Sequence, residues 1–175
     1  STLIGTGDNW TKMKKISVTE YLNYEGGKFS KSRGTGVFGN DAKDTGIPSE
    51  VWRYYLLVNR PENDDSDFHW NDLASKNNGE LLANLGNFVN RVVAYTVKNL
   101  GGRTPDLVPE AEPAIAALSS EVSKLATEYT KLFDQIKIKE ALKCAMNISR
   151  AGNQYLQETT FWSAFKTNPA LGGAY

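Results

Sequence analysis

The chain has 175 residues, enough for one domain, or for a small domain beside a helical bundle, with a sizeable buried core. Its 20 basic and 20 acidic side chains cancel, so no overall field would steer it to RNA or to a membrane surface. The only cysteine, Cys144, excludes a disulfide framework and a cysteine zinc cluster and is expected to be a buried thiol, and no apolar run approaches the roughly 18 residues of a membrane span.

Residues 16–24 alternate β-branched and aromatic residues with polar ones, which predicts a strand. The strand leads into a compact basic loop, residues 28–34, with three cations, two hydroxyls and no acid. Gly34, Gly36 and Gly39 would act as hinges, so this strip is suited to closing on a polyphosphate. The same composition also fits a solvated basic turn or a modification site.

A helix is expected to begin at Pro48 and end at Pro61, because four apolar residues follow helical spacing between them: Val51, Trp52, Tyr55 and Leu56. Residues 62–67 are acidic and rich in turn formers. They predict an exposed connector whose charges are solvated.

A second helix should begin near Asn71 or Asp72 and end at about Leu100, before two glycines. Gly79 and Gly86 lower its helix propensity, which predicts a bend or a close helix contact. A broad apolar stripe is expected to pack inward: Leu81, Leu82, Leu85, Phe88, Val89, Val92 and Val93.

Three prolines mark residues 103–113 as a linker. Apolar spacing then predicts a third helix over about 118–132 and a fourth over 138–157, which would pack as an antiparallel bundle. The small, glycine-containing residues 167–175 are expected to fray. The fold class predicted is mainly α, with a small α/β segment before a helical bundle.

Residues 28–32 read Lys-Phe-Ser-Lys-Ser and resemble the KMSKS signature of class I aminoacyl-tRNA synthetases, with Phe29 in place of Met. Ordered matches from about Thr19 to Trp162 resemble the methionyl-tRNA synthetase family in its cytoplasmic eukaryotic form. The segments that carry this resemblance are residues 36–39, 46–48, 52–57, 59–62, 80–91 and 152–156.

The resemblance implies a parent enzyme that uses ATP, with Mg²⁺, to activate methionine for protein biosynthesis. In that reaction the substrate carboxylate attacks the α-phosphate of ATP, and the protein acts mainly by positioning and by placing cations where charge builds. Lys31 would stabilise the leaving pyrophosphate, and Lys28 would be an auxiliary ATP-binding cation. Ser30 and Ser32 would hydrogen-bond to backbone or phosphate as the loop closes.

Half of the catalytic site has no counterpart in this sequence. The family's other nucleotide motif, HIGH, needs two histidines, whereas the chain has only His69, for which packing or a surface hydrogen bond is expected. The family's zinc-binding insertion is missing too, and we expect no structurally bound metal or cofactor. Because the chain starts at Ser1 without a Met, we expect a piece of a longer protein that does not activate methionine alone.

Asn87 and Arg91 are four residues apart, so a helix would project both from one side. Trp162 follows a predicted helix end and could be either a core plug or a platform for base stacking. The pattern alone also fits an ordinary polar face. The resemblance aligns Asn87, Arg91 and Trp162 with the family's anticodon-reading residues, which implies recognition of the CAU anticodon of initiator and elongator tRNA(Met).

We expect residues 1–70 to hold the end of the catalytic region, with the KMSKS-like loop and a stem-contact segment, and residues 71–175 to form a C-terminally incomplete anticodon-binding bundle. Incompleteness would leave some apolar surface uncovered. The expected location is the cytoplasm, and the expected partner is tRNA(Met), with neither DNA nor a membrane. Membership of a multi-synthetase complex is left open by the sequence.

Three alternatives also fit the residues. The first is another class I synthetase, such as the cysteinyl or isoleucyl enzyme. The second is a stand-alone RNA-binding or assembly module that kept the helices and lost catalysis. The third is a helical interaction bundle with no RNA role.

Overall fold

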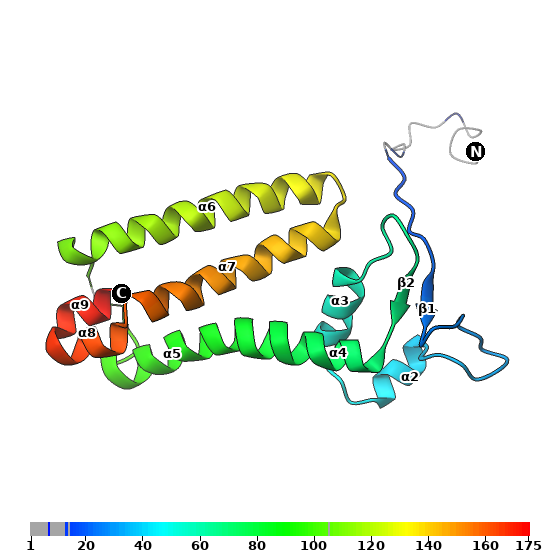
Figure 1. Ribbon diagram of the computed structural model, residues 1–175, viewed down its shortest axis with the longest axis horizontal. Coiled ribbons are helices and arrows are strands. Elements are labelled where there is room, and N and C mark those ends of the chain that lie inside the picture. Colours follow the sequence, from blue (N-terminus) through cyan, green and yellow to red (C-terminus); the bar gives the residue numbers. More distant parts are fainter. Residues whose placement is uncertain (1–6, 8–12, 14, 105) are drawn as a thin grey trace.

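The computed structural model describes residues 7, 13, 15–104 and 106–175, and they form an elongated, mainly helical molecule (Figure 1). A small α/β unit occupies one end, a long row of helical segments runs away from it, and a helical hairpin lies beside that row. The fold class predicted from the sequence is confirmed.

The α/β unit is a parallel strand pair joined by a helical crossover. Strand β1 (Leu22–Tyr24) is followed by helices α2 (Gly39–Asp44) and α3 (Ser49–Val58), and then by β2 (Ser66–Phe68). The register pairs Leu22 with Ser66 and Tyr24 with Phe68. Parallel strands need a connection of this length because the chain must return to the same sheet end.

Two local predictions for this unit were wrong. The strand expected over residues 16–24 is limited to Leu22–Tyr24. The connector expected over residues 62–67 contains most of β2, and its acids are not simply solvated. Glu62 pairs with Arg60 at 3.4 Å and accepts a hydrogen bond from the Lys139 backbone N–H, at the start of another helix.

Aromatic side chains fill the core of the α/β unit. Tyr55, Phe68 and Leu73 are buried, and the indoles of Trp52 and Trp70 pack against Phe68. Side chains of α3, β2 and the first turn of the next helix therefore pack together around Phe68.

The second predicted helix exists, but its middle is not α-helical. It runs as α4 (Trp70–Lys76), a π-helical segment η1 (Asn77–Gly86) and α5 (Asn87–Leu100). It ends where the glycine signal places it, because Gly101 adopts the left-handed conformation at φ 63°. The π-helical segment spans both glycines for which a bend or close contact was expected.

The inward packing predicted for the whole apolar stripe was wrong. Leu82 is 65% exposed, Val89 49% and Val93 55%, whereas Leu81 and Phe88 are half-buried. The stripe is wider than the surface that the neighbouring helices cover. The stripe therefore leaves some apolar surface uncovered among the described residues.

The hairpin consists of α6 (Glu112–Asp134), which follows the short 3-10 helix η2 (Pro109–Ala111), and α7 (Ile138–Glu158). Helix α7 lies close to its predicted bounds. Helix α6 ends near its predicted end but begins inside the predicted linker 103–113, which also contains η2. Helix α7 packs on α6, η1, α5 and α3, so it is the central helix of the molecule. Cys144 lies on it as a free, half-buried thiol rather than a fully buried one.

The C-terminal residues do not fray as predicted. Two short helices, α8 (Phe161–Thr167) and α9 (Pro169–Ala174), fold back against the hairpin. The Asn168 side chain accepts a hydrogen bond from the Leu171 N–H and so caps α9. Gly172 is buried, and the Tyr175 ring packs on Tyr155. Within the described part of the chain, no helix has both the length and the hydropathy to cross a membrane.

Candidate functional sites

The basic loop is a tight hairpin on the end of β1. Ser30 and Thr35 exchange both backbone hydrogen bonds, at 2.8 and 2.9 Å, and close a turn over residues 31–34. Gly34 takes a left-handed conformation at φ 65°, which allows the reversal. Gly39, by contrast, begins helix α2 and is not a hinge in the left-handed region.

Phe29 anchors this hairpin, although the family signature has Met at its position. Its ring packs against Tyr24 at 5.3 Å and Phe38 at 5.8 Å between centroids. Gly36 lies against the same ring, so close that a Cβ there would come within 2.3 Å of it. Phe29, the apolar residue of the signature, therefore packs against the α/β unit and anchors the loop. The polar residues on either side of it can face the solvent.

The predicted site residues of the loop lie together. Lys28, Lys31 and Ser32 are exposed, Ser30 is half-buried, and the Ser30 and Ser32 hydroxyls are 3.4 Å apart. Among the described residues, neither lysine nor Arg33 forms an ion pair. The hairpin thus presents three uncompensated cations and two hydroxyls to solvent, an arrangement that can bind a polyanion.

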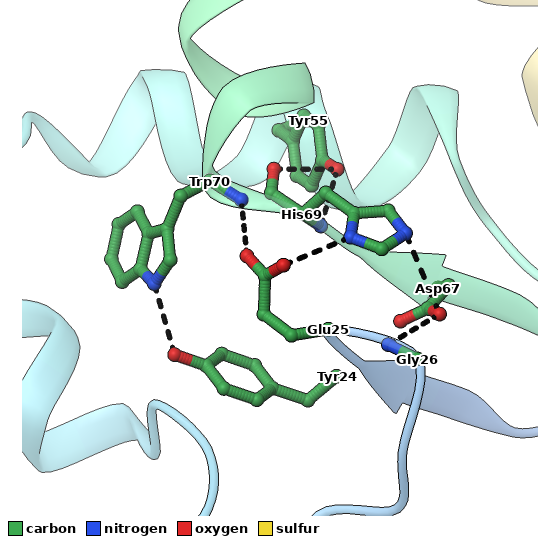
Figure 2. Close-up of polar contacts among 7 residues, drawn as sticks. All are labelled: Tyr24, Glu25, Gly26, Tyr55, Asp67, His69 and Trp70. Atoms are coloured by element: carbon green, nitrogen blue, oxygen red, sulfur yellow. Dashed lines mark hydrogen bonds and ion pairs between the residues drawn. The ribbon is translucent and has the colours of Figure 1, made fainter.

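His69 lies at the base of the same hairpin, exposed and hydrogen-bonded (Figure 2). Its Nδ1 is 3.1 Å from Glu25 Oε2, and this bond raises the pKa of His69 above its ordinary value. The Trp70 N–H and His69 together hold the pKa of Glu25 below its ordinary value. The surface hydrogen bond expected for this histidine is confirmed.

Asn87 and Arg91 lie on α5, and Trp162 lies on α8, which is at the end of the molecule away from the strand pair (Figure 1). The Arg91 guanidinium carbon is 5.4 Å from the centre of the Trp162 ring, within the range of a cation–π contact. Asn87 and Arg91 line one groove of about 490 Å³, while Arg91 and Trp162 line a second of about 430 Å³. Arg91 therefore joins the two grooves.

Trp162 is not a core plug, because its neighbour Phe161 takes that position. Phe161 is buried and meets the Tyr95 ring at 4.6 Å, whereas Trp162 remains 37% exposed. Thr160, at φ 44°, adopts the left-handed conformation just before α8. The indole is thus available to solvent beside the guanidinium.

Side chains of α7 that the sequence reading did not assign complete the first groove. Arg150, Asn153, Gln154 and Gln157 line it opposite Asn87, and no acidic residue is among the described residues that line it. Their spacing of three and four residues was the available signal, since it places polar groups on one helical face. The groove is thus lined by two arginines and by amide groups.

Two amide side chains, the buried Asn84 and the half-buried Asn153, link the two walls of this groove. The Asn84 side chain donates to the Met146 carbonyl at 2.9 Å, and the Asn153 side chain donates to the Asn84 carbonyl at 2.9 Å. Gly152 permits this approach, because its backbone lies directly against the Phe88 ring. These hydrogen bonds join η1 to α7 at the groove.

A cationic hairpin on a parallel strand pair, followed by a helical bundle with an exposed Arg–Trp face, is consistent with the class I aminoacyl-tRNA synthetases that the sequence resembles. The family described as "tRNA synthetases class I (M)" matches residues 1–93, and "Anticodon binding domain of methionyl tRNA ligase" matches residues 108–174. The first match spans more than half of the chain, which therefore belongs to the class I tRNA synthetases of the methionyl type.

Relatives and solved structures agree with this assignment. The chain is 56% identical over 175 residues to a probable methionine–tRNA ligase of Oryza sativa subsp. japonica, covering 97% of this chain and 22% of that protein. It is 54% identical over 176 residues to the cytoplasmic methionine–tRNA ligase of Arabidopsis thaliana, with 98% and 22% covered. Its fold matches Mycobacterium tuberculosis methionyl-tRNA synthetase in complex with methionyl-adenylate, with a TM-score of 0.76, 25% identity, and 88% of this chain and 31% of that chain covered.

The chain thus spans about a fifth of the length of the curated relatives it matches. These matches favour the methionyl type over the cysteinyl and isoleucyl enzymes.

Proposed function

We propose that this chain is the tRNA-facing part of a methionine–tRNA ligase, which activates methionine with ATP and transfers it to tRNA(Met). The observation that carries the proposal is the pairing of Arg91 with an exposed Trp162, two residues far apart in the sequence that the fold brings onto one surface. The exposed cations of the hairpin at the other end of the molecule support the ATP-dependent half of the reaction.

In the activation step, Lys31 would stabilise the pyrophosphate as it leaves, and Lys28 would assist it. The absence of ion-pair partners among the described residues supports this role, because an unpaired ammonium is free to meet phosphate. Ser30 and Ser32 would hydrogen-bond to backbone or phosphate as the loop closes. Magnesium would accompany ATP, and no described group of three or more metal-ligating side chains gives it a site on this chain.

The activation proposal is tested by ATP–pyrophosphate exchange in the full-length protein that carries this sequence. Lys31→Ala should lower the exchange rate on the order of 10²-fold to 10³-fold, the usual effect of removing one charge-stabilising donor. Lys43→Ala is the matched control, because Lys43 is an exposed cation on α2, away from the loop tip. We expect no exchange from the 175 residues alone, and measurable exchange from clean material would contradict the inference that half the site lies elsewhere.

In tRNA recognition, Trp162 would stack on an unpaired anticodon base, and Asn87 and Arg91 would hydrogen-bond to base edges. An aromatic platform contributes about 1 to 3 kcal/mol per stacked base. Asn and Arg present several fixed donors, which suits the reading of splayed single-stranded bases. The two arginines that line the groove beside them, Arg91 and Arg150, favour an anionic backbone.

This recognition is tested with an anticodon stem-loop of tRNA(Met) at one fixed ionic strength. Trp162→Ala and Arg91→Ala should each weaken binding about tenfold or more, as the loss of one stacking or base contact does. Arg103→Ala is the control, because it removes the same charge from an exposed residue outside both grooves. If all three variants lost affinity equally, the binding would be explained by nonspecific charge and not by base recognition.

We divide the chain between residues 70 and 71, with the loop and stem-contact segment before this point and the C-terminally incomplete anticodon-binding bundle after it.

We infer that the parent acts in the cytoplasm, because several relatives are named as cytoplasmic ligases. Assembly with other synthetases in a multi-synthetase complex stays a prediction. A stand-alone RNA-binding module would bind the stem-loop equally well, but its full-length protein would show no exchange.

A further inference from the structure

The base of the basic hairpin is a two-residue turn whose geometry demands outside support. Tyr24 and Gly27 exchange backbone hydrogen bonds at 2.7 and 2.9 Å across Glu25 and Gly26. Both central residues have positive φ, 49° for Glu25 and 79° for Gly26. This conformation is easy for glycine and unfavourable for glutamate, so the Glu25 side chain must gain contacts that offset it.

Those contacts all lead to the junction between β2 and α4 (Figure 2). One Glu25 carboxylate oxygen accepts from the Trp70 N–H at 2.9 Å, and the other lies 3.1 Å from His69 Nδ1. Asp67 accepts from the Gly26 N–H at 2.8 Å and faces His69 Nε2 at 3.5 Å. The imidazole therefore stands between two carboxylates, one from the turn and one from β2.

Neighbouring side chains hold the junction itself. The Tyr24 hydroxyl accepts from the Trp70 indole N–H at 2.9 Å, and the buried Tyr55 hydroxyl contacts the backbone of His69. Helix α4 begins at this point and continues through η1 into α5. The turn that precedes Lys28 is thus tied to the start of the helical row that carries the RNA-facing residues.

We propose that Glu25, His69 and Asp67 form a latch, in which a protonated imidazole bridges two carboxylates and fixes the base of the 28–34 hairpin to the start of α4. His69 is then a positioning residue for Lys28 and Lys31. The latch is a property of the structure alone, while its effect on the reaction rests on the proposed function of the loop.

The latch has a definite pH window. Only the imidazolium has a proton on both ring nitrogens, so the neutral ring can serve one carboxylate and not both. The carboxylates of Glu25, Asp67 and Asp72 all interact electrostatically with the imidazole. The weakly acidic Tyr55 hydroxyl hydrogen-bonds to the His69 backbone. All three carboxylates favour the charged ring.

The signs of the shifts set the limits of this window. The pKa of His69 is raised, so its contribution is complete below the ordinary value of 6.5 and is lost as pH rises through the raised value. The pKa of Glu25 is lowered, so its contribution is complete above the ordinary value of 4.5 and is lost as pH falls through the lowered value. The latch should be strongest between 4.5 and 6.5.

His69 is the only histidine of the sequence, so its ring signal in a ¹H–¹³C spectrum needs no assignment. In the 175-residue chain we expect its titration midpoint above 6.5, with Glu25→Gln and Asp67→Asn each moving it down. Glu20→Gln is the matched control, because Glu20 is exposed and its side chain makes no described contact. A His69 midpoint at the ordinary value of 6.5 that is the same in Glu25→Gln would overturn the latch.

Amide hydrogen exchange tests whether the latch orders the hairpin. After correction for the intrinsic pH dependence, protection of the Gly26 and Ser30 amides should fall as His69 loses its proton. Glu25→Gln should abolish this pH-dependent fall in protection, and Glu20→Gln should preserve it. If protection in the unmodified chain did not change as His69 titrates, a positioning role would be contradicted.

The functional arm uses ATP–pyrophosphate exchange by the full-length protein. Glu25→Gln should lower kcat, leave the KM for methionine unchanged and remove the step in the pH profile that follows His69. Exchange by the unmodified protein with no difference between Glu25→Gln and Glu20→Gln would refute the positioning role. Absence of exchange in the unmodified protein would instead refute the proposed function, and the titration would still decide the latch.

Discussion

Replacement of Gly152 by alanine should destabilise the chain, although helix propensity favours alanine. A Cβ at position 152 would lie 2.5 Å from two atoms of the Phe88 ring and 3.0 Å from a third. The nearest of these distances is roughly an ångström short of ordinary contact, so α5 and α7 must separate. Overpacking costs about 1–3 kcal/mol, and a clash with two ring atoms belongs in the upper part of that range, about 2–3 kcal/mol. The propensity gain returns about 1 kcal/mol, which leaves a net loss of about 1–2 kcal/mol.

Urea unfolding followed by circular dichroism measures this loss. With an m-value of about 2 kcal/mol/M, the midpoint should fall by about 0.5–1 M. Gly79→Ala is the matched control, because nothing lies within 4 Å of its Cβ position and the same substitution should be neutral or stabilising there. In a Phe88→Ala background, Gly152→Ala should no longer destabilise. Unchanged or greater stability of Gly152→Ala in the original chain would refute the close-packing argument.

Two further substitutions test the walls and the loop. Asn84→Ala removes the donor to the buried Met146 carbonyl and should cost about 1–3 kcal/mol in the same unfolding assay, whereas the exposed Asn90→Ala should change little. Gly36→Ala should displace the Phe29 ring, since its Cβ would lie 2.3 Å away at a backbone φ of 127°. Faster amide exchange at the base of the hairpin would report that displacement, and unchanged exchange would show that Phe29 is not its anchor.

The long helices of the hairpin could be predicted from the sequence because their signals are local. Apolar residues repeat at intervals of three and four, and residues 135–137 separate the two periodic runs. The end of α5 at Leu100 could be predicted for the same reason, because two glycines directly follow it in the sequence.

The errors arise where partners distant in the sequence decide the structure. Strand β2 has only three residues and exists because it pairs with β1, whereas its acidic composition alone favours a connector. The C-terminal helix α9 depends on Gly172, which fits against the Phe165 backbone and would be expected to loosen a helix by propensity. The apolar stripe was misjudged because periodicity tells which face is apolar and not how much of it is covered.

The candidate sites divide in the same way. The hairpin residues are contiguous in the sequence, so one motif could locate them. The pairing of Arg91 with Trp162 was reached only through the resemblance, because nothing local shows that Phe161 would take the core position instead of its neighbour. The groove residues Arg150 and Gln154 were missed, although their spacing on one helical face was visible.

The most direct test of the account is a comparison of binding of the unmodified chain to the tRNA(Met) anticodon stem-loop with CAU and with each base of that triplet changed in turn. Selective reading by Asn87, Arg91 and Trp162 requires CAU to bind at least about tenfold more tightly, equivalent to about 1.4 kcal/mol, at one ionic strength. Equal affinity for every triplet would contradict the anticodon-reading assignment.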